Sequence, residues 1–522
     1  MRIARFWILG LVVWMFGITP VFAQQKVLIQ CNGIYSTIPS RPGWSKFERQ
    51  VIIQHLGTRI YCDYAEHNQS TGQFEARSNL RIKTKEGGII TGATLRNNPK
   101  QNMMIVDKDV VFTDKDSTQL FTDRMVYDQK NDISTYTTGG RIISDSTVLT
   151  SKIGHYHGKT KAFHCKTDVV IVNPDYTIYT DTLQMVDGIT YFFSPTHVYS
   201  DSNYLYCENG WYKTKEKVAN LKDNAFIQTK EQKMYGDSIY YEMDREFGMA
   251  FGNVTVIDSV NDIIIHSDFA LNNKKQGDAW FTDNAVGLVV SDSDTLFLRG
   301  DTLRIVYDSN ENAKYMLAYY HVRFFREDMQ GLCDSMAYVM VDSTMTLFKD
   351  PIVWANSDQL SGDTISVLLS QNKPKSMHMG ERAFVVSKGY HEGHFNQIKG
   401  RLLDGFFNDS SELERINVDE NVETVYFVTD DADSSLIGIL KVNAVQMEIV
   451  MEQRAISTIN YFQPDDGSMF PETDLPEKDR FLKGFVWDID RRPKSKYDIL
   501  PKSSNAANHT EVNHLLESAQ TN

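Results

Sequence analysis

A short phrase recurs along this chain: an apolar residue, any residue, a small residue and then aspartate. Its eight copies end at Asp63, Asp123, Asp181, Asp237, Asp268, Asp301, Asp334 and Asp363. The last five aspartates are separated by 31, 33, 33 and 29 residues, and the two steps between Asp123 and Asp237 are 58 and 56 residues, close to twice that period. A fixed period of this size is typical of stacked supersecondary units, so the phrase predicts a repeat protein with a unit of ~30 residues.

Two strands meet at each aspartate. Apolar residues alternate on both sides, as with Leu298 before Asp301 and with Leu303 and Ile305 after it. A period of two is typical of a half-buried strand, and the alternation slips by one position at the aspartate, as expected at a corner that keeps both arms facing one interior. The small residue fits inside the bend, and the carboxylate can accept backbone N–H groups there. We therefore expect an all-β fold of short antiparallel strands with the eight aspartates as structural corners.

The inward positions of these strands form two facing apolar rows. Their members are Ile178, Leu183, Val198, Ile239, Ile265, Leu298, Leu303, Met336 and Ile365. If the two arms of each unit close on each other, the rows are simply a core. If one side stays open, they line an apolar groove, and these nine residues are then the candidates for contact with a lipid.

The repeated aspartates carry two further interpretations. A ladder of carboxylates binds calcium in secreted β-rolls, but that motif needs Gly and Asp at much denser spacing than one aspartate per ~30 residues. Several corners also read Asp-Ser/Thr-apolar, as in Asp237-Ser238-Ile239. This resembles an O-glycosylation sequence of Gram-negative envelope proteins, and Ser or Thr equally suits the start of a strand.

The sequence contains no pattern typical of an enzyme. A nucleophile elbow, a Walker A loop and a dinucleotide fingerprint are all missing. His391-Glu392-Gly393-His394 superficially resembles a zinc motif, but its histidines are three residues apart and the glycine disfavours a helix. We therefore expect no catalytic residues, no metal site and no cofactor.

Residues 1–23 are predicted to be a cleavable signal peptide. Arg2 and Arg5 precede the apolar run Phe6 to Ile18, which is too short for a comfortable membrane span, and Val21-Phe22-Ala23 offers the small residues that a signal peptidase needs. Cleavage removes two arginines and no acid, so the net charge of −14 becomes −16. This acidic chain is a poor partner for nucleic acid or for an anionic membrane surface. We expect a soluble protein of an envelope or extracellular compartment.

Cysteine usage leaves one pairing open in such a compartment. Cys62 and Cys333 occupy the small corner position, where we expect buried thiols, although a Cys31–Cys62 disulfide remains an alternative.

The chain divides into five predicted regions. The signal peptide is followed by an irregular lead-in over 24–57 and by regular repeats over 58–400, which can form one module or two. Residues 401–501 resume β-patterning and then become proline-rich, with the aromatic residues Phe481, Phe485 and Trp487, as in a segment that packs as a cap. The polar tail 502–522 is expected to be disordered.

Two paired phrases resemble a known family. Ile60-Tyr61-Cys62-Asp63 is followed by Ala76-Arg77-Ser78-Asn79-Leu80, and Met234-Tyr235-Gly236-Asp237 is followed by Ala250-Phe251-Gly252-Asn253-Val254. Both resemble the repeat of the OstA-like family, which includes the periplasmic lipopolysaccharide-transport protein LptA and the N-terminal domain of LptD. The resemblance covers about 24–400.

The resemblance implies a twisted, elongated β-jellyroll that is open along one side, in the periplasm of a Gram-negative bacterium. Its apolar groove would shield lipopolysaccharide acyl chains on their way to the outer membrane. It also implies that edge strands pair with inner-membrane and outer-membrane transport components, with head-to-tail self-association as a further option.

Two alternatives remain open at this point. A structural or adhesive β-solenoid would have the same repeats around a closed core with no lipid. A carbohydrate-active β-helix would need clustered carboxylates on one face, whereas these aspartates are spread along the repeats.

Overall fold

A computed structural model describes residues 27–201, 203–290, 295–310, 312–370, 373–410, 412–430, 434–452 and 455–500. The predicted signal peptide and C-terminal tail lie outside these ranges. Contacts divide the chain into two compact units, Met1–Asn173 (unit 1) and Pro174–Asn522 (unit 2). Within the described ranges no helix is long and apolar enough to cross a membrane.

Unit 1 contains only strands among its described residues. They are β1 (Leu28–Gln30), β2 (Tyr35–Thr37), β3 (Trp44–His55), β4 (Thr58–Asn68), β5 (Phe74–Lys83), β6 (Ile89–Asn98), β7 (Met103–Thr113), β8 (Gln119–Asp128), β9 (Ile133–Tyr136), β10 (Gly140–Ser144), β11 (Thr147–Ser151), β12 (Ile153–His157) and β13 (Ala162–Asn173). All the pairings between them are antiparallel, and most join neighbours in the sequence.

Unit 2 repeats this arrangement over its described residues, with short 3₁₀ helices at some turns and in its last segment. Its strands are β14 (Tyr176–Val186), β15 (Ile189–Phe192), β16 (Thr196–Ser200), β17 (Tyr204–Cys207), β18 (Asn209–Lys213), β19 (Val218–Gln228), β20 (Gln232–Glu242), β21 (Phe247–Asp258), β22 (Ile263–Asn273), β23 (Asp278–Thr282), β24 (Val286–Val290), β25 (Thr295–Arg299), β26 (Thr302–Tyr307), β27 (Ala313–Phe325), β28 (Met329–Val339), β29 (Thr344–Phe348), β30 (Ile352–Ala355), β31 (Asp358–Ser361), β32 (Thr364–Ser370), β33 (Lys373–Gly380), β34 (Ala383–Lys388), β35 (Phe395–Gly400), β36 (Leu402–Phe407), β37 (Leu413–Thr429), β38 (Leu436–Glu452) and β39 (Ala455–Phe470). The 3₁₀ helices are η1 (Met243–Arg245), η2 (Lys274–Gln276), η3 (Glu472–Asp474), η4 (Glu477–Arg480), η5 (Ile489–Arg491) and η6 (Lys496–Asp498). The predicted all-β fold of stacked short antiparallel strands is confirmed.

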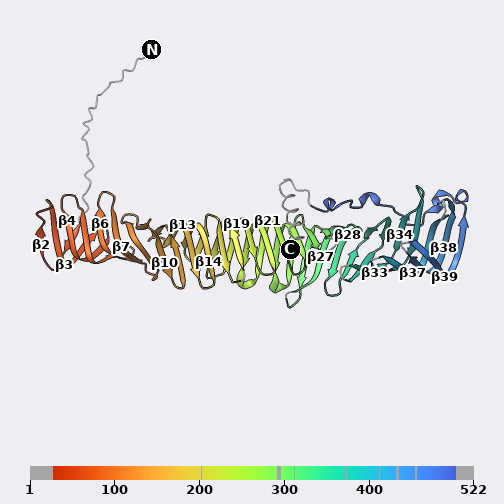
Figure 1. The fold of residues 1–522 in the computed structure, drawn as a ribbon, viewed down its shortest axis with the longest axis horizontal. Helices are drawn as coiled ribbons and strands as arrows, with labels where there is room; N and C mark the ends of the chain where they lie inside the picture. The colour runs from red at the N-terminus through yellow and green to blue at the C-terminus, as the bar shows by residue number, and fades with distance from the viewer. Residues whose placement is uncertain are drawn as a thin grey trace, which may run out of the picture. The chain divides into compact units, whose positions relative to one another are not determined.

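The strands of unit 2 form two layers joined along one line of corners (Figure 1). Layer A consists of β15, β18, β23, β26, β29, β32, β33, β36 and the halves of longer strands that pair with them. Layer B consists of β16, β17, β24, β25, β30, β31, β34, β35 and the other halves. The layers face each other, because a Cβ added at Gly287 in β24 would lie 3.2 Å from Leu303 Cδ1 in β26. Unit 1 has the same layers, in the two halves of β3 to β8 and in the short strands that follow.

Each long strand changes layer at a register shift. In the pairing of β20 with β21, Tyr235 lies opposite Thr255 and Ser238 lies opposite Phe251, so the corner falls between these pairs. Asp237 occupies the corner in β20, and Gly252 (φ 68°) and Asn253 (φ 47°) occupy it in β21. Two consecutive left-handed residues bend the strand, and Gly and Asn adopt that conformation with the least strain.

The corner aspartates are hydrogen-bonded by the side chains of these left-handed residues. Asn253 Nδ2 donates to Asp237 Oδ1 and Oδ2 at 3.2 Å, and Asn284 Nδ2 donates to Asp268 Oδ2 at 2.7 Å. The equivalent donors to Asp63, Asp301, Asp334 and Asp363 are Asn79, His321, Lys349 and Arg382. Asp181 instead accepts from the neighbouring Thr182 hydroxyl at 3.0 Å.

The small residue before each aspartate is buried, while the aspartate itself is exposed or half-buried. Cys62 and Cys333 are such small residues, and burial raises the pKa of each of their thiols to about 12. All five cysteines are free, so Cys31 and Cys62 form no disulfide.

The range 24–57 is not the irregular lead-in that we expected. It contains β1, β2 and β3, and β3 already turns a corner at Arg49 (φ 70°) and Gln50 (φ 48°). This corner pair contains no Gly or Asn, so its residue types did not indicate a corner in the sequence. At the other end the layers continue through β37, β38 and β39, past residue 400.

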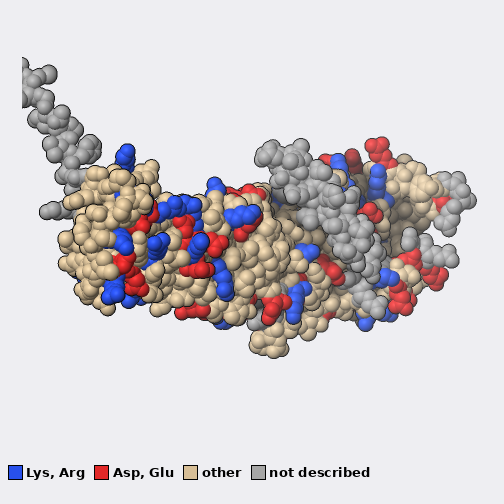
Figure 2. All heavy atoms as spheres, turned by 60° about the vertical axis from the view of Figure 1, so that its left-hand side comes forward, with Lys and Arg blue, Asp and Glu red and all other residues tan. Residues whose placement is uncertain are grey.

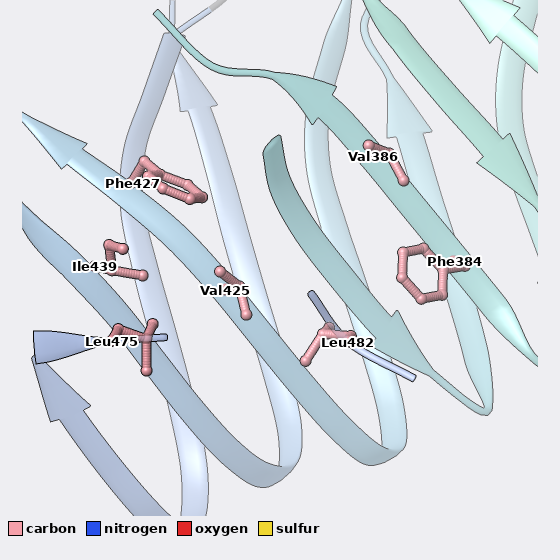
Figure 3. Close-up of a cluster of buried hydrophobic side chains, with 7 residues drawn as sticks. All are labelled: Phe384, Val386, Val425, Phe427, Ile439, Leu475 and Leu482. Atoms are coloured by element: carbon pink, nitrogen blue, oxygen red, sulfur yellow. The ribbon is translucent and has the colours of Figure 1, made fainter. Parts of the chain in front are cut away.

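The segment that follows β39, residues 471–500, is here called the strap. It turns back over layer B of unit 2, as the blue trace above β34 and β28 shows in Figure 1. Leu475 and Leu482 pack against Phe384 and Val425 (Figure 3), and Ile499 and Leu500 pack in a second cluster with Ile264, Val286, Leu288 and Phe297. Hence the strap lies along the side of the layers.

Three buried glutamines of layer B hold the strap. Gln359 Nε2 donates to Val486 O at 2.7 Å, and its Oε1 accepts from Asp488 N at 2.8 Å. Gln397 makes the same pair of bonds to Arg480 O and Leu482 N, and Gln330 Oε1 accepts from Arg492 Nε at 2.7 Å. A buried amide that satisfies backbone groups fixes the register of an extended segment.

The corner geometry predicts that Gly252→Ala destabilises the protein. The new Cβ would require a left-handed alanine and would lie 2.2 Å from Asp237 Oδ2, so we expect a loss of about 1–3 kcal/mol in unfolding free energy. The measurement is the urea midpoint of the full chain. Gly188→Ala is the matched control, since Gly188 has φ 76° with nothing within 4 Å. Equal losses in the two variants would mean that the contact with Asp237 contributes nothing.

The glutamine contacts predict that Gln359→Ala loosens the strap. It leaves Val486 O, Asp488 N and Trp354 Nε1 without their partner, at a cost of about 1–3 kcal/mol for each buried group. Limited proteolysis should then cleave within 483–498 faster than in the parent protein. Gln228→Ala, on the exposed end of β19, should leave the rate unchanged. Unaltered cleavage in Gln359→Ala would contradict this role of the glutamine.

Candidate functional site

The structure brings the nine predicted groove residues to the facing inner surfaces of unit 2. Ile178, Val198, Ile265 and Leu298 lie in layer B, and Leu183, Ile239, Leu303, Met336 and Ile365 lie in layer A. Eight of them are at most 2% exposed, and Val198 is half-buried. The inner surface is therefore continuous and apolar along the unit.

A narrow cavity lies between the two layers at β20–β26. Small side chains of layer A, including Gly248, Ala250, Ala270 and Ala279, face larger ones of layer B such as Ile265. The cavity volume is about 20 Å³, which is room for roughly one water molecule. An acyl chain can enter here only if side chains change rotamer or the layers separate.

The free ends of the two layers give this cavity a polar margin. Gln232 and Asp258 contribute from layer B, and Asn272 and Tyr307 contribute from layer A. Gln232 Nε2 donates to Asp258 Oδ2 at 3.2 Å. Asn272 Oδ1 is buried with no hydrogen-bond partner within the described part of the chain. The site is thus apolar in depth and polar at its rim, the arrangement that an amphipathic ligand requires.

Methionines line the inner surface of layer A in the later repeats. The six buried ones are Met316, Met336, Met345, Met377, Met379 and Met447. Five of them were missed from the sequence, although a methionine spaced at each unit was a signal that could have identified them. A flexible, polarizable thioether fills irregular space and repacks around different ligands, as at other promiscuous apolar surfaces.

In unit 1 the free ends of the layers meet. His55 Nδ1 and Gln129 Oε1 lie 3.0 Å apart, Gln129 Nε2 donates to His55 O at 3.2 Å, and both residues are buried. Burial lowers the pKa of His55. Lys161 and Asp116 form a second bridge of 2.6 Å. The open side expected from the resemblance is closed by side chains at these points of unit 1.

A polar cavity of about 140 Å³ lies between the free ends of unit 1. Asp114 and Lys115 line it from the turn between β7 and β8, and Asp132, Ser134 and Lys159 line it from the turn before β9, from β9 and from the turn after β12. Asp132 Oδ1 accepts from Tyr127 Oη at 2.6 Å, while its Oδ2 is buried with no partner among the described residues. Water fills such a space more readily than an acyl chain does.

The described residues contain no group of three or more His, Cys, Asp or Glu side chains placed to hold a metal ion. The histidines of the His391–His394 motif contact other groups. His391 Nε2 lies 3.1 Å from Ser434 O, and His394 Nε2 lies 3.1 Å from Glu472 Oε1 of the strap. The His394 hydrogen bond, together with Arg480, lowers the pKa of Glu472.

Charged side chains are mixed in sign on the face shown in Figure 2, where Lys and Arg lie among Asp and Glu. In unit 1, for example, Asp107 accepts from Arg96 at 3.0 Å and lies 3.5 Å from Arg124. A nucleic-acid partner would require a basic stripe instead.

Two parts of this chain match known protein families, and one part is similar to a solved structure. Residues 24–181 match the family of OstA-like proteins, and residues 265–373 match the family described as LptA/(LptD N-terminal domain) LPS transport protein. A similar solved structure is that of LptH, the LptA homologous periplasmic component of the lipopolysaccharide transport device from Pseudomonas aeruginosa. It is 16% identical over 23% of this chain and 85% of that chain, with a TM-score of 0.20. Among curated proteins, none matches.

The first match covers unit 1 and the first residues of unit 2, whereas the second lies within unit 2 and its description names lipopolysaccharide transport. These matches confirm the resemblance of the corner phrases to the OstA-like, LptA/LptD family over residues 24–181 and 265–373.

Proposed function

We propose that this protein is a periplasmic, lipopolysaccharide-binding bridge that shields acyl chains between its two layers during transport to the outer membrane. The observation that carries the proposal is the continuous apolar inner surface of unit 2, with small residues in one layer and methionines further along. The family matches support the same ligand. The protein performs no catalysis, and it reaches the periplasm through its signal peptide.

The free energy gained by moving acyl chains into this interior is large. Burying a methylene gains ~0.8 kcal/mol, so a chain of about twelve carbons gains on the order of 9 kcal/mol. This gain must offset the separation of the layers or the repacking of methionines, because the interior is nearly filled without a ligand. Sugars and phosphates remain outside, at the polar margin.

A second candidate is a structural β-solenoid with a permanently closed core. The small cavity volume favours it, since a packed interior needs no ligand to be stable. The two candidates differ in whether lipid reaches the inner positions.

Photo-crosslinking to lipopolysaccharide in cells distinguishes them. Probes at the inward positions Ile239, Leu303 and Ile365 should give lipid adducts, and probes at the outward neighbours Tyr240 and Arg304 should not. A further probe replaces Ile265, which lines the cavity, and Ala270→Val, which narrows the cavity from layer A, should reduce the lipid adduct of that probe. A folded, abundant protein without adducts at any inward position would favour the closed solenoid.

The last strand of unit 2 suggests how the bridge joins its partners. β39 is sixteen residues long and, among the described strands, pairs only with β38, so one edge of it is unpaired. We propose that β39 receives a strand from an envelope transport component by antiparallel pairing. A second copy of this chain is the other possible partner.

A photoreactive residue at Thr458 in β39 should therefore crosslink to a transport component or to a second copy. The same residue at Thr150 in β11, an exposed threonine that has a neighbouring strand on each side, is the control. Equal adducts from both positions, or none from Thr458, would exclude β39 as the docking edge.

A further inference from the structure

Seven aromatic rings lie together on the surface of unit 2. They come from β14, β16, β17, β19 and β20 and are here called the aromatic platform: Tyr179, His197, Tyr199, Tyr204, Tyr206, Phe226 and Tyr235. Successive rings are in contact. The centroid distances are 6.0 Å for Tyr179–Tyr199, 5.0 Å for Tyr199–Tyr204, 5.7 Å for Tyr204–Phe226 and 4.5 Å for Phe226–Tyr235.

The platform lies on the outer face of layer B. The residues that alternate with these rings point inward and are buried, as Ile178, Leu205 and Ala225 show. Tyr179 and Tyr199 are each 48% exposed, and the other five rings are half-buried. An exposed aromatic area of this extent outside the core is typical of a binding surface.

The same outer face already binds a segment further along the unit. The outer row that begins at Tyr199 and Tyr204 passes through Gln228, Lys233 and Ile257 before it reaches Ile264, Leu288 and Phe297. Ile499 and Leu500 of the strap cover these last three residues. The described part of the strap ends there, at Leu500, and none of its residues packs on β14–β20. The platform is thus the uncovered continuation of an established contact surface.

The chemistry of the platform suits a polyhydroxylated ligand. Its seven side chains include no Lys, Arg, Asp or Glu, and Lys233 and Glu208 lie beside them. Flat ring faces pack against the C–H faces of a sugar, while phenol and imidazole groups exchange hydrogen bonds with its hydroxyls. The polar tips are already ordered: His197 Nδ1 lies 2.9 Å from Tyr204 Oη, and Tyr206 Oη donates to Glu208 Oε1 at 3.4 Å.

The position of the platform fits the saccharide of the lipid proposed above. Tyr199 and Tyr204 pair with each other beside the turn at the free end of layer B. This is the margin at which the polar part of a lipid leaves the space between the layers. From there the rings continue down the outer face to Tyr179 and Tyr235.

We propose that the aromatic platform binds the saccharide of the transported glycolipid by stacking of its tyrosines on sugar rings. This inference rests on the proposed function and adds a second contact to it. Acyl chains between the layers and sugars on the platform would bind as linked sites, so each raises the effective concentration of the other.

The test uses the full-length protein and lipid-free polysaccharide, released from lipopolysaccharide by mild acid. Calorimetric titration should detect binding to the parent protein. Tyr179→Ala with Tyr199→Ala should weaken it by about two- to tenfold per ring. Tyr179→Phe with Tyr199→Phe should retain most of it, because the stacking faces remain. The matched control is Tyr390→Ala, which should bind as the parent does. Tyr390 lies in a turn of unit 2, and its side chain is 76% exposed.

Absence of polysaccharide binding by the parent protein, or equal losses in the Tyr390 and platform variants, would overturn the proposal. A photoreactive residue at Tyr199 that links to the chain's own C-terminal residues or to a second copy, and not to saccharide, would also overturn it. Lipid adducts at Ile265 are measured in the same variants. If the parent protein forms lipid adducts at Ile265 but does not bind polysaccharide, only the role of the platform is rejected. If the parent protein forms no lipid adduct at Ile265, the proposed function is rejected.

Discussion

The architecture depends on one local conformation, the pair of consecutive left-handed residues opposite an aspartate. In β21 the pair is Gly252 and Asn253, and it turns the strand from one layer into the other without breaking its pairing to β20 and β22. Because the bend adds one residue to the strand that carries the left-handed pair, the apolar alternation resumes on the inner face after every corner. Two facing apolar layers follow from repeating this bend. The Asn253–Asp237 hydrogen bonds then satisfy polar groups that the bend exposes.

The sequence predicted those parts of the fold that leave a periodic mark. The small residue and aspartate of each corner, and the inward positions such as Leu303 and Ile365, follow from alternation and spacing alone. The corner of β3 was missed because Arg49 and Gln50 are ordinary residues that only tertiary context holds at positive φ. The path of the strap was missed for a different reason: its contacts with Gln359 and Gln397 join residues more than eighty positions apart, and single glutamines in strands carry no distinctive pattern.

How open the interior is depends on side-chain volumes across the layers rather than on the repeat. Ala250 and Ala270 leave a narrow space opposite Ile265, while Met336 and Met379 fill theirs. A lipid can therefore enter the interior only if side chains change rotamer or the layers separate. Methionine is suited to this, because its rotamers are many and close in energy, and a rigid aromatic core would resist the same change. Affinity in such a site reflects the gain from burying methylenes less the work of rearranging the core.

The strap changes how the repeats of unit 2 depend on one another. In an ordinary repeat array each unit contacts only its neighbours, so the ends fray first and stability is a sum of local terms. Here one segment, anchored at Leu475 and again at Leu500, touches strands from β38 back to β22. Opening the last repeats would release contacts made far up the array. The strap thus couples the repeats that carry the unpaired edge of β39 to strands in the middle of unit 2, so local opening at that edge is opposed by contacts that a simple stack of repeats does not have.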